Sequence, residues 1–203
     1  LETRERLGVE VVRGDLGDQP SLVRAGSGVA LVFHAAGRVS DWGPRESFLR
    51  ANAEGTRNVV AACQEAGVSR LVHLSSLTVL GLPRDGRVIS ESTPTAPPAS
   101  GDFYTESKLA GEWSVREAHG KNGLSTTVVR PGAIWGPSDP NVVPRIVRLL
   151  RRGAMPYVCG GRNLLGLSYV DNLVLGLVLA AETASAAGQL YHVTDGEEIT
   201  AHE

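Results

Sequence analysis

Five short runs of apolar residues recur along the chain, and most of them are continuous rather than alternating. Continuous apolar runs are typical of strands that are buried on both faces of a parallel sheet. The segments between the runs are helix-like, so strands and helices alternate. This order predicts a doubly wound α/β fold with a parallel sheet. The predicted strands are Val9–Val12, Ala30–His34, Arg70–Leu74, Ser125–Val129 and Gln189–Val193.

The clearest helical pattern covers residues 46–66. Apolar and small residues recur there at i, i+3, i+4 and i+7, and Asn52 and Gly55 fall on the same face. A buried amide needs hydrogen-bond partners. Asn52 is therefore either a core residue bonded to a neighbouring loop or a brace for a cofactor-binding loop. Gly55 indicates close packing of this helix against the sheet.

Two further helices are predicted at residues 141–152 and 169–181. In the second helix, Asp171 and Asn172 stand near the start, where they could cap the first turn. The first helix carries a basic stripe, which is either a solvated face or a clamp for an anionic substrate. The stripe consists of Arg145, Arg148 and Arg152.

Composition limits the classes of function that need to be considered. The chain has 203 residues, 42% of them hydrophobic, and a net charge of -2, which is typical of a soluble globular protein and gives no indication of nucleic acid or an anionic membrane as a partner. Cys63 and Cys159 lie far apart in the sequence, so we expect neither a disulfide framework nor a metal site. We therefore expect a cytoplasmic location. The longest apolar run, Leu173–Ala181, is shorter than the ~20 residues of a membrane span and is predicted to be a core helix.

A tyrosine and a lysine stand four residues apart after a long Pro- and Gly-rich stretch. That stretch, from Gly81 to Gly101, is either a binding lid or a surface excursion, and Asp102 is the candidate N-cap of the helix that follows. Tyr104 and Lys108 are then separated by one turn, ~6 Å of rise, and share a face. The pair is either a surface pair or the acid/base group of alcohol/carbonyl redox chemistry, with Tyr104 exchanging the proton.

The energetics of this tyrosine favour a nicotinamide cofactor beside it. Free tyrosine titrates near ~10, and lowering that pKa to about 7 needs roughly 4 kcal/mol, at ~1.36 kcal/mol per unit. A single lysine supplies only part of this stabilisation. A cationic nicotinamide ring could add the rest.

Small, acidic or hydroxyl residues follow four of the predicted strands. In open α/β sheets ligands bind beyond the carboxyl ends of the strands. Small side chains there let the backbone approach a flat or phosphorylated ligand. The four strand ends are Gly14-Asp15-Leu16, Ala35-Ala36-Gly37, Ser75-Ser76 and Pro131-Gly132.

Seven motifs, spread over nearly the whole chain, resemble those of the extended short-chain dehydrogenase/reductases. Within that family, the segments 39–44 and 191–196 look most similar to the 3β-hydroxysteroid dehydrogenase-type branch, which also holds bacterial reductases of lipid-derived keto acids. The motifs are Gly14-Asp15-Leu16, Phe33-His34-Ala35-Ala36-Gly37, Asn52-x-x-Gly55-Thr56, Leu74-Ser75-Ser76, Tyr104-x-x-Ser107-Lys108, Arg130-Pro131-Gly132 and Tyr169-Val170-Asp171-Asn172.

The resemblance implies roles for individual residues. Tyr104 would be the acid/base, Lys108 would bind the nicotinamide ribose and lower the pKa of Tyr104, and Ser76 would hydrogen-bond the substrate oxygen, with Ser75 as the fallback. The remaining residues would bind NAD or NADP. Asp15 and Leu16 would contact the adenine, and Ala35, Ala36 and Gly37 would line the ribose and diphosphate on a loop braced by Asn52. Pro131 and Gly132 would fix the nicotinamide face, and Ser75 is also counted among the cofactor contacts.

The resemblance also implies a domain organisation. Residues 1–135 would be a Rossmann-like NAD(P)-binding domain, and residues 136–203 part of a small C-terminal substrate-binding lobe with segments that return to the core. The family begins with a G-x-x-G-x-x-G turn that holds the diphosphate, and these 203 residues contain no such turn. Either the sequence is truncated or the domain is degenerate; we expect truncation, and an isolated chain that is inactive. Phe103, where many relatives carry Pro, is a smaller departure.

The function implied is an NAD(P)-dependent oxidoreductase that interconverts a secondary alcohol and a ketone on an apolar, steroid-like or long-chain 3-oxo/3-hydroxy substrate. One alternative is a nucleotide-sugar 4-epimerase, which the basic stripe supports. A dehydratase is disfavoured because Leu77 and Thr78 follow Ser76, where such enzymes carry an Asp-Glu pair. The other alternative is a non-catalytic Rossmann relative. The expected partner is a small molecule, and a homodimer stays open.

Overall fold

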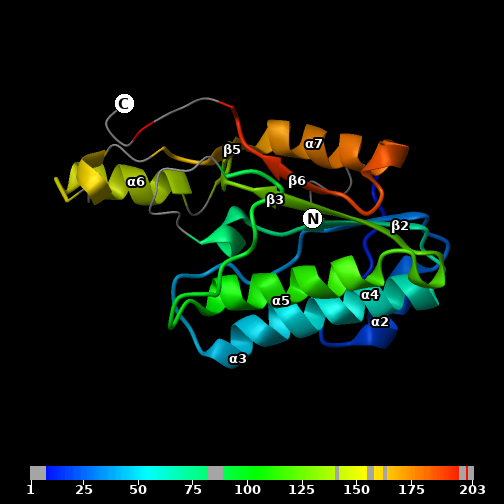
Figure 1. Cartoon of the computed structure of the whole chain (residues 1–203). Coiled ribbons are helices and arrows are strands. Elements are labelled where there is room, and N and C mark those ends of the chain that lie inside the picture. The colour runs from blue at the N-terminus through cyan, green and yellow to red at the C-terminus, as the bar shows by residue number, and fades with distance from the viewer. Residues whose placement is uncertain are drawn as a thin grey trace.

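The main element of the computed structural model is a four-stranded parallel sheet in the order β1-β2-β3-β6 (Figure 1). The structure describes residues 8–81, 89–139, 142–154, 158–161, 164–196 and 200. A separate two-stranded parallel sheet is formed by β4 and β5. The strands are β1 (Leu31–His34), β2 (Arg70–Leu74), β3 (Ser125–Pro131), β4 (Ala133–Trp135), β5 (Leu167–Tyr169) and β6 (Leu190–Val193).

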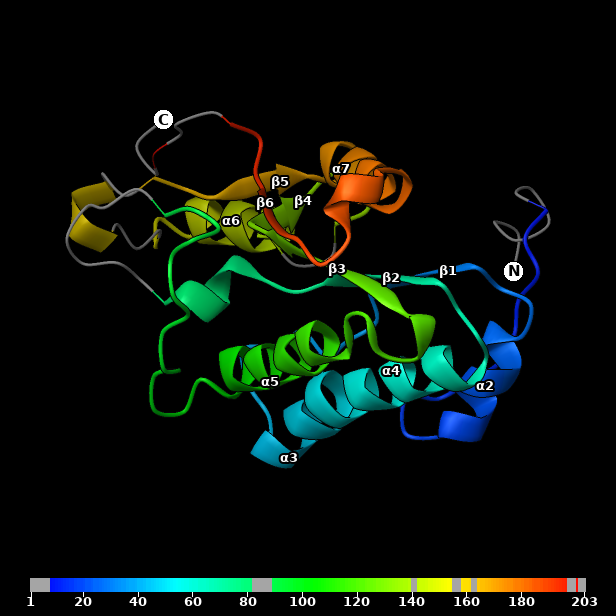
Figure 2. The same ribbon diagram turned by 45° about the vertical axis from the view of Figure 1, so that its right-hand side comes forward.

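Helices cover both faces of the large sheet (Figures 1 and 2). On one face lie α2 (Gln19–Gly26), α3 (Arg45–Phe48), α4 (Gly55–Glu65) and α5 (Phe103–Ala118), and on the other lies α7 (Val170–Glu182). The prediction of a doubly wound parallel sheet is thus confirmed. The remaining α-helix, α6 (Val142–Arg151), contacts β4. Short 3₁₀ helices span Leu77–Leu80, Lys121–Gly123, Val158–Gly161 and Ala184–Ala186.

The two faces of the sheet carry separate apolar clusters. Leu71 of β2 and Val128 of β3 pack with residues of α4 and α5, whereas Val72 and Val129, one position further along, pack against α7. Successive side chains of a strand point to opposite faces. Burial on both faces therefore explains why these strands are continuously apolar in sequence.

Four of the five predicted strands are confirmed, and the prediction for Val9–Val12 is wrong. The segment forms no strand, and the side chains of Val9, Val11 and Val12 are about half exposed. A strand needs a neighbour to satisfy its backbone N–H and C=O groups. In the described part of the chain, β1 pairs only with β2, and nothing pairs with residues 9–12.

The predicted helix at residues 46–66 is confirmed with one irregularity. It runs from α3 through a π-helical segment, Leu49–Glu54, into α4. Such π-helical turns occur frequently at functional sites, and this one buries Asn52. Gly55 packs closely, but against Leu16 rather than against the sheet, because a Cβ added at Gly55 would lie 2.9 Å from the Leu16 Cβ.

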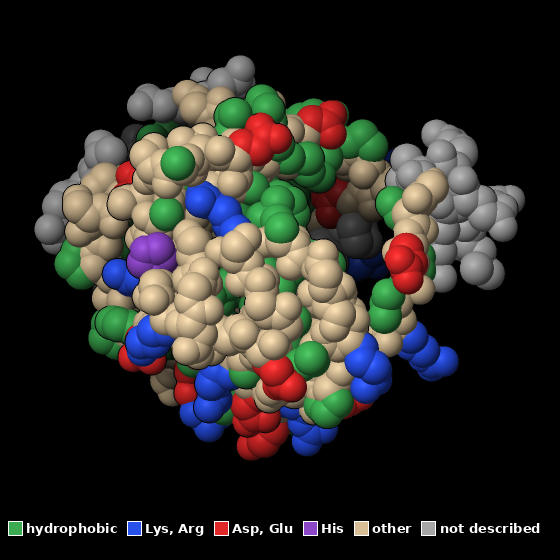
Figure 3. All heavy atoms as spheres, turned by 90° about the vertical axis from the view of Figure 1, so that its right-hand side faces the viewer, with side chains coloured by type: hydrophobic (Ala, Val, Ile, Leu, Met, Phe, Trp, Pro, Cys, Tyr) green, Lys and Arg blue, Asp and Glu red, His purple; other side chains and the backbone are tan. Residues whose placement is uncertain are grey.

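The two later helices are confirmed as α6 and α7, with residue 141 outside the described residues. Asp171 and Asn172 do not cap the backbone at the start of α7. Instead Asp195 accepts hydrogen bonds from the Tyr169 backbone N–H at 2.7 and 2.9 Å. The expectation of a core helix at Leu173–Ala181 holds for one side only, since Leu175 is 59% exposed. Hydrophobic side chains reach the surface in the upper half of the face drawn in Figure 3.

The sequence also predicts that a disulfide, a metal site and a membrane-spanning helix are absent. Burial raises the pKa of the Cys63 thiol to about 11, so it stays protonated, and the Cys159 side chain lies outside the described residues. Among the residues that the structure describes, no group of three His, Cys, Asp or Glu residues could hold a metal ion. None of the described helices combines the length and apolar character that a bilayer crossing requires.

We expect Gly111→Ala to destabilise the protein by about 1–3 kcal/mol, because overpacking forces backbone shifts. A Cβ at Gly111 in α5 would lie 2.3 Å from the Asn52 carbonyl oxygen, so α5 and the π-helical segment would have to separate. The matched control is Gly176→Ala in α7, where the nearest atom, Val193 Cγ2, is 3.4 Å away. That variant gains roughly 0.5–1 kcal/mol of helix propensity. Urea unfolding measures both, and equal stabilities for the two variants would contradict the close packing.

Candidate active site

The N-terminal half of α5 faces the carboxyl end of β2. Asp102 begins the helix as predicted, because its carboxylate accepts a hydrogen bond from the Thr105 N–H at 3.0 Å. The side chain of Ser76 lies near the phenol of Tyr104 and acts to lower its pKa. One turn further along, the Lys108 ammonium donates to the Leu74 carbonyl at 2.5 Å. The structure thus brings together the three predicted catalytic residues.

The environment of Tyr104 keeps its phenol protonated. Burial raises the pKa of Tyr104, the carboxylate of Asp102 raises it further, and the side chain of Ser76 opposes both. Ser76 itself accepts hydrogen bonds from the backbone N–H and the hydroxyl of Thr78, at 3.2 and 3.0 Å. The net direction is opposite to the lowering that the sequence predicts. Any contribution from Lys108 and a nicotinamide ring stays a prediction.

Lys108 is the cation of a buried basic cluster and is only 8% exposed. Burial lowers its pKa to about 8, while the carboxylate of Glu112 acts to raise it. The rings of His34 and His73 lie 5.1 Å apart on neighbouring strands. Burial and the Lys108 charge lower the pKa of His34 to about 4 and that of His73 well below its usual 6.5. Both imidazoles are therefore neutral, and the positive charge resides on the lysine.

Asn52 connects the loop after β1 to α5. Its Oδ1 accepts a hydrogen bond from the Arg38 N–H at 2.7 Å, and its Nδ2 donates to the Arg38 carbonyl at 3.0 Å and to Ser107 Oγ at 2.9 Å. A Cβ at Gly37 would lie 2.8 Å from Asn52 Oδ1, so the loop requires glycine there. The contact with a neighbouring loop is confirmed, and the cofactor roles of Asn52 and of Ala35-Ala36-Gly37 stay predictions.

The remaining predicted cofactor residues are held by local contacts. The carboxylate of Asp15 accepts a hydrogen bond from the Gly17 N–H at 2.7 Å, and Leu16 packs against the cluster beneath α4 and α5. Gly132, which follows Pro131 at the end of β3, lies so close to Gly166 that an added Cβ would be 2.2 Å from the Gly166 carbonyl oxygen. These contacts fix the backbone at Asp15, which follows no strand in the structure, and at the end of β3. Whether these residues contact a cofactor stays a prediction.

Sequence reasoning missed four residues of this region. Ser75 does not face Tyr104; its hydroxyl donates to Glu112 Oε2 at 2.7 Å. Glu112 is in turn paired with Arg130 of β3. Glu112 could have been found, because it continues the i, i+4 spacing of Tyr104 and Lys108 by one turn. The other two residues are His34 and His73. His34 stands in one of the seven motifs and His73 in an apolar run, but neither position indicates that the two rings lie together.

The parallel sheet and the tyrosine, lysine and serine at its carboxyl edge are those of an extended short-chain dehydrogenase/reductase. Residues 1–202 match the model of the 3-beta hydroxysteroid dehydrogenase/isomerase family, and the chain belongs to this family. The resemblance seen in the sequence motifs is thereby confirmed.

Individual relatives differ in the chemistry that their names describe. The chain is 39% identical over 200 residues to sterol-4-alpha-carboxylate 3-dehydrogenase, decarboxylating, of Bos taurus, covering 94% of this chain and 55% of the relative. It is 35% identical over 207 residues to 2-alkyl-3-oxoalkanoate reductase of Stenotrophomonas maltophilia, covering 97% and 61%. The chain thus spans between half and two thirds of the length of these relatives.

A solved structure with the same fold contains a bound dinucleotide. It is a double mutant of dTDP-glucose 4,6-dehydratase from Streptomyces venezuelae with NAD bound, and it superposes with a TM-score of 0.80 at 28% identity. The match covers 93% of this chain and 59% of the dehydratase chain. This similarity agrees with the doubly wound sheet described above.

Proposed function

We propose that this protein is an NAD(P)-dependent oxidoreductase that interconverts a secondary alcohol and a ketone on an apolar substrate. The observation that carries the proposal is that Tyr104, whose phenol is influenced by the Ser76 side chain at the carboxyl end of β2, stands one helical turn from the buried cation Lys108, which donates to the Leu74 carbonyl at 2.5 Å. Ligands of open α/β sheets bind at this edge. The family and the NAD-bound structural neighbour support the same class of reaction.

The residues present fit a nicotinamide dinucleotide. Small side chains at residues 35–37, on a loop held by Asn52, leave backbone exposed beyond β1, and Lys108 offers a positive charge beside β2. A nicotinamide bound there would supply or accept the hydride at the carbinol carbon. The domain boundary at residue 135 and a cytoplasmic location are further parts of this proposal, and a homodimer stays open.

The roles of the side chains follow from their protonation. Ser76 would donate a hydrogen bond to the carbonyl oxygen of the substrate, which polarises the carbonyl. Tyr104, whose raised pKa keeps it protonated, would give its proton to the same oxygen during reduction and would take it back during oxidation. Lys108 would stabilise the phenolate that the proton transfer leaves behind.

The names of the relatives narrow the substrate class. Both describe a reacting position at carbon 3 of a molecule that also carries a carboxylate, a sterol in one case and an alkanoate in the other. We therefore propose a 3-hydroxy or 3-oxo acid with a large apolar body. We expect the full-length protein to oxidise or reduce such acids and to be inactive toward UDP-sugars. NAD(P)H absorbance measures the reaction, and turnover of UDP-glucose without turnover of any 3-oxo acid would contradict the proposal.

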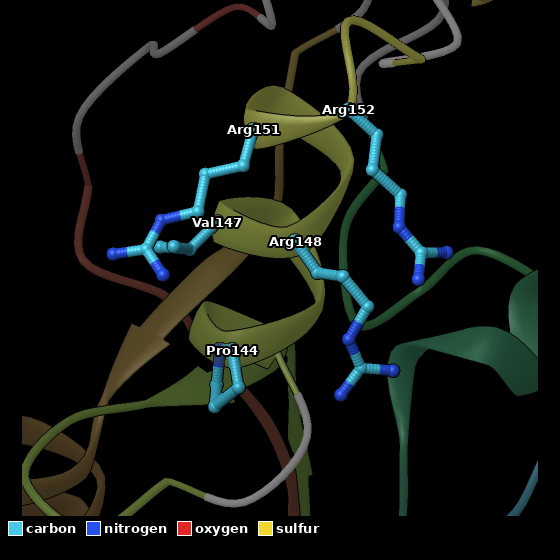
Figure 4. Close-up of a pocket in the computed structure, with 5 residues that line it drawn as sticks. All are labelled: Pro144, Val147, Arg148, Arg151 and Arg152. Carbon is cyan, nitrogen blue, oxygen red and sulfur yellow. The ribbon is translucent and has the colours of Figure 1, made fainter.

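One surface favours a second candidate, a nucleotide-sugar 4-epimerase. Arg148 of α6 and Arg152, which directly follows α6, extend to the same side of the helix and line a groove together with Pro144, Val147 and Arg151 (Figure 4). Arg145 is instead paired with Asp41 in the loop after β1. The groove suits an anionic group such as a diphosphate. A thermal-shift comparison of UDP-sugars with sterol carboxylates separates the two candidates.

A further inference from the structure

The most deeply buried charges of the described residues form one ion pair, between Glu112 of α5 and Arg130 of β3. Each side chain is 1% exposed. Arg130 donates twice, from Nε to Glu112 Oε2 at 2.9 Å and from Nη2 to Glu112 Oε1 at 2.5 Å. Ser75 donates to the same Oε2 at 2.7 Å. The carboxylate is thereby fixed from β3 and from the residue that directly follows β2.

Stability alone is a poor reason for such a pair. Buried ion pairs cost desolvation energy that their attraction often fails to recover, and apolar replacements of similar volume are often as stable. Here Nη1 of Arg130 is also buried, without a hydrogen-bond partner among the described residues. The arrangement is therefore not optimised for stability, and its position next to the candidate site suggests another role.

Glu112 makes the third of three side-chain contacts between α5 and the end of β2. Tyr104 contacts Ser76, Lys108 contacts the Leu74 carbonyl, and Glu112 contacts Ser75. The three helix residues are spaced by one turn each and lie on one face. A shift of α5 along β2 would break all three contacts together. The buried Glu112 contact therefore fixes the position of α5 at Tyr104 and Lys108 as well.

We propose that Glu112, clamped by Arg130 and Ser75, is a positioning residue that holds a negative charge one turn from Lys108, keeps that lysine cationic and sets the placement of Tyr104 on Ser76. This inference deepens the proposed function and rests on it for its catalytic consequence. The electrostatic part concerns the protein alone.

The other charged and titratable groups around Lys108 act against its positive charge or have little influence on it. His34 on β1 and His73 on β2 are neutral, because burial and the Lys108 charge lower the pKa of each imidazole. Tyr104 on α5 is protonated, and Arg130 on β3 is a cation. Burial disfavours the ammonium, and Glu112 is the group that acts in its favour. Removing the carboxylate should therefore lower the pKa of Lys108, so that the ammonium loses its proton at a lower pH than in the parent protein.

The test is a direct titration of Lys108 by NMR. Residues 1–203 contain only two lysines, Lys108 and the exposed Lys121, so [¹³Cε]lysine labelling gives few signals, and Lys108→Arg assigns the relevant one. We expect the midpoint of Lys108 to fall by at least about one pH unit in Glu112→Gln, from the loss of an opposite charge at i+4. The matched control is Arg116→Ala, which removes the exposed guanidinium 3.7 Å from Glu112 and should leave the midpoint unchanged.

A second variant keeps the test informative if Glu112→Gln does not fold. Glu112→Leu combined with Arg130→Met removes both buried charges and leaves an apolar contact. If this double variant is folded and Lys108 again titrates at lower pH, the proposal holds. Because the double variant also removes the Arg130 cation, its Lys108 midpoint is expected to fall by less than in Glu112→Gln. A Lys108 midpoint that falls in neither folded variant would overturn the proposal.

The catalytic consequence is measured separately in the full-length protein. The alkaline limb of kcat/KM is expected to move to lower pH in Glu112→Gln by the same amount as the NMR midpoint, with unchanged kcat/KM in Arg116→Ala. A purely structural role would lower kcat/KM equally at every pH, which counts against the proposal. A shifted NMR midpoint together with full turnover in Tyr104→Phe would instead refute the proposed function and leave the electrostatic role of Glu112 intact.

Discussion

Tyr104→Phe is expected to lower kcat of the full-length protein by about 10²–10⁴-fold, the usual contribution of a positioned acid/base group. The substitution removes only the hydroxyl that contacts Ser76 and leaves the ring in place. Without that hydroxyl, no acid is positioned to protonate the substrate oxygen. Hydride transfer to the carbonyl would then leave an unprotonated alkoxide, which is higher in energy. Substrate affinity should change much less than kcat, because the interaction is made mainly in the transition state.

Two comparisons make this experiment specific. Tyr191→Phe removes a hydroxyl from β6, a strand that pairs with β3, and is expected to keep the turnover of the parent protein. Ser76→Ala should lower kcat as well, because it removes the group that would polarise the carbonyl. The assay follows NAD(P)H absorbance with a 3-oxo or 3-hydroxy acid, and thermal unfolding confirms that each variant is folded. Tyr104→Phe with near-parental kcat would show that another group moves the proton.

The sequence predicted the sheet well because its strands are buried on both faces. Leu71 and Val72 belong to different apolar clusters, and continuous apolar runs record that double burial directly. The failure at Val9–Val12 has the opposite origin. Its composition is that of a strand, but a strand also requires a partner for its backbone, and composition carries no information about the partner.

The site was predicted in part, for a similar reason. The i, i+4 spacing of Tyr104 and Lys108 is local, so the helix places both residues wherever it packs. The pairing of Glu112 with Arg130 joins residues on α5 and β3, and no local pattern specifies it. The direction of the Tyr104 pKa was also beyond reach, because it is set by burial, which depends on the packing of the whole domain.

The protein is expected to lose about 2 kcal/mol of stability between pH 7.5 and pH 5 through His34 alone. The folded-state pKa of His34 is about 4, because burial and the Lys108 charge disfavour the imidazolium, whereas the unfolded chain titrates near 6.5. Between these values the unfolded state binds more protons, so stability falls as pH falls. The stability that His34 contributes is fully present above about pH 6.5, and its loss approaches about 3 kcal/mol near pH 4, at ~1.36 kcal/mol per unit.

Urea unfolding of the parent protein and of His34→Gln at both pH values isolates this effect. Glutamine retains a group that can hydrogen-bond Thr56 Oγ1, which lies 3.0 Å from His34 Nε2, but does not titrate. The carboxylates titrate alike in both proteins and cancel in the difference. His73, which lies in contact with His34 and whose pKa is lowered in the same direction, remains in both proteins and should keep part of the pH dependence in the variant. If parent and variant lose equal stability on acidification, His34 is not held neutral by its surroundings, and the basic cluster around Lys108 is less deeply buried than these contacts indicate.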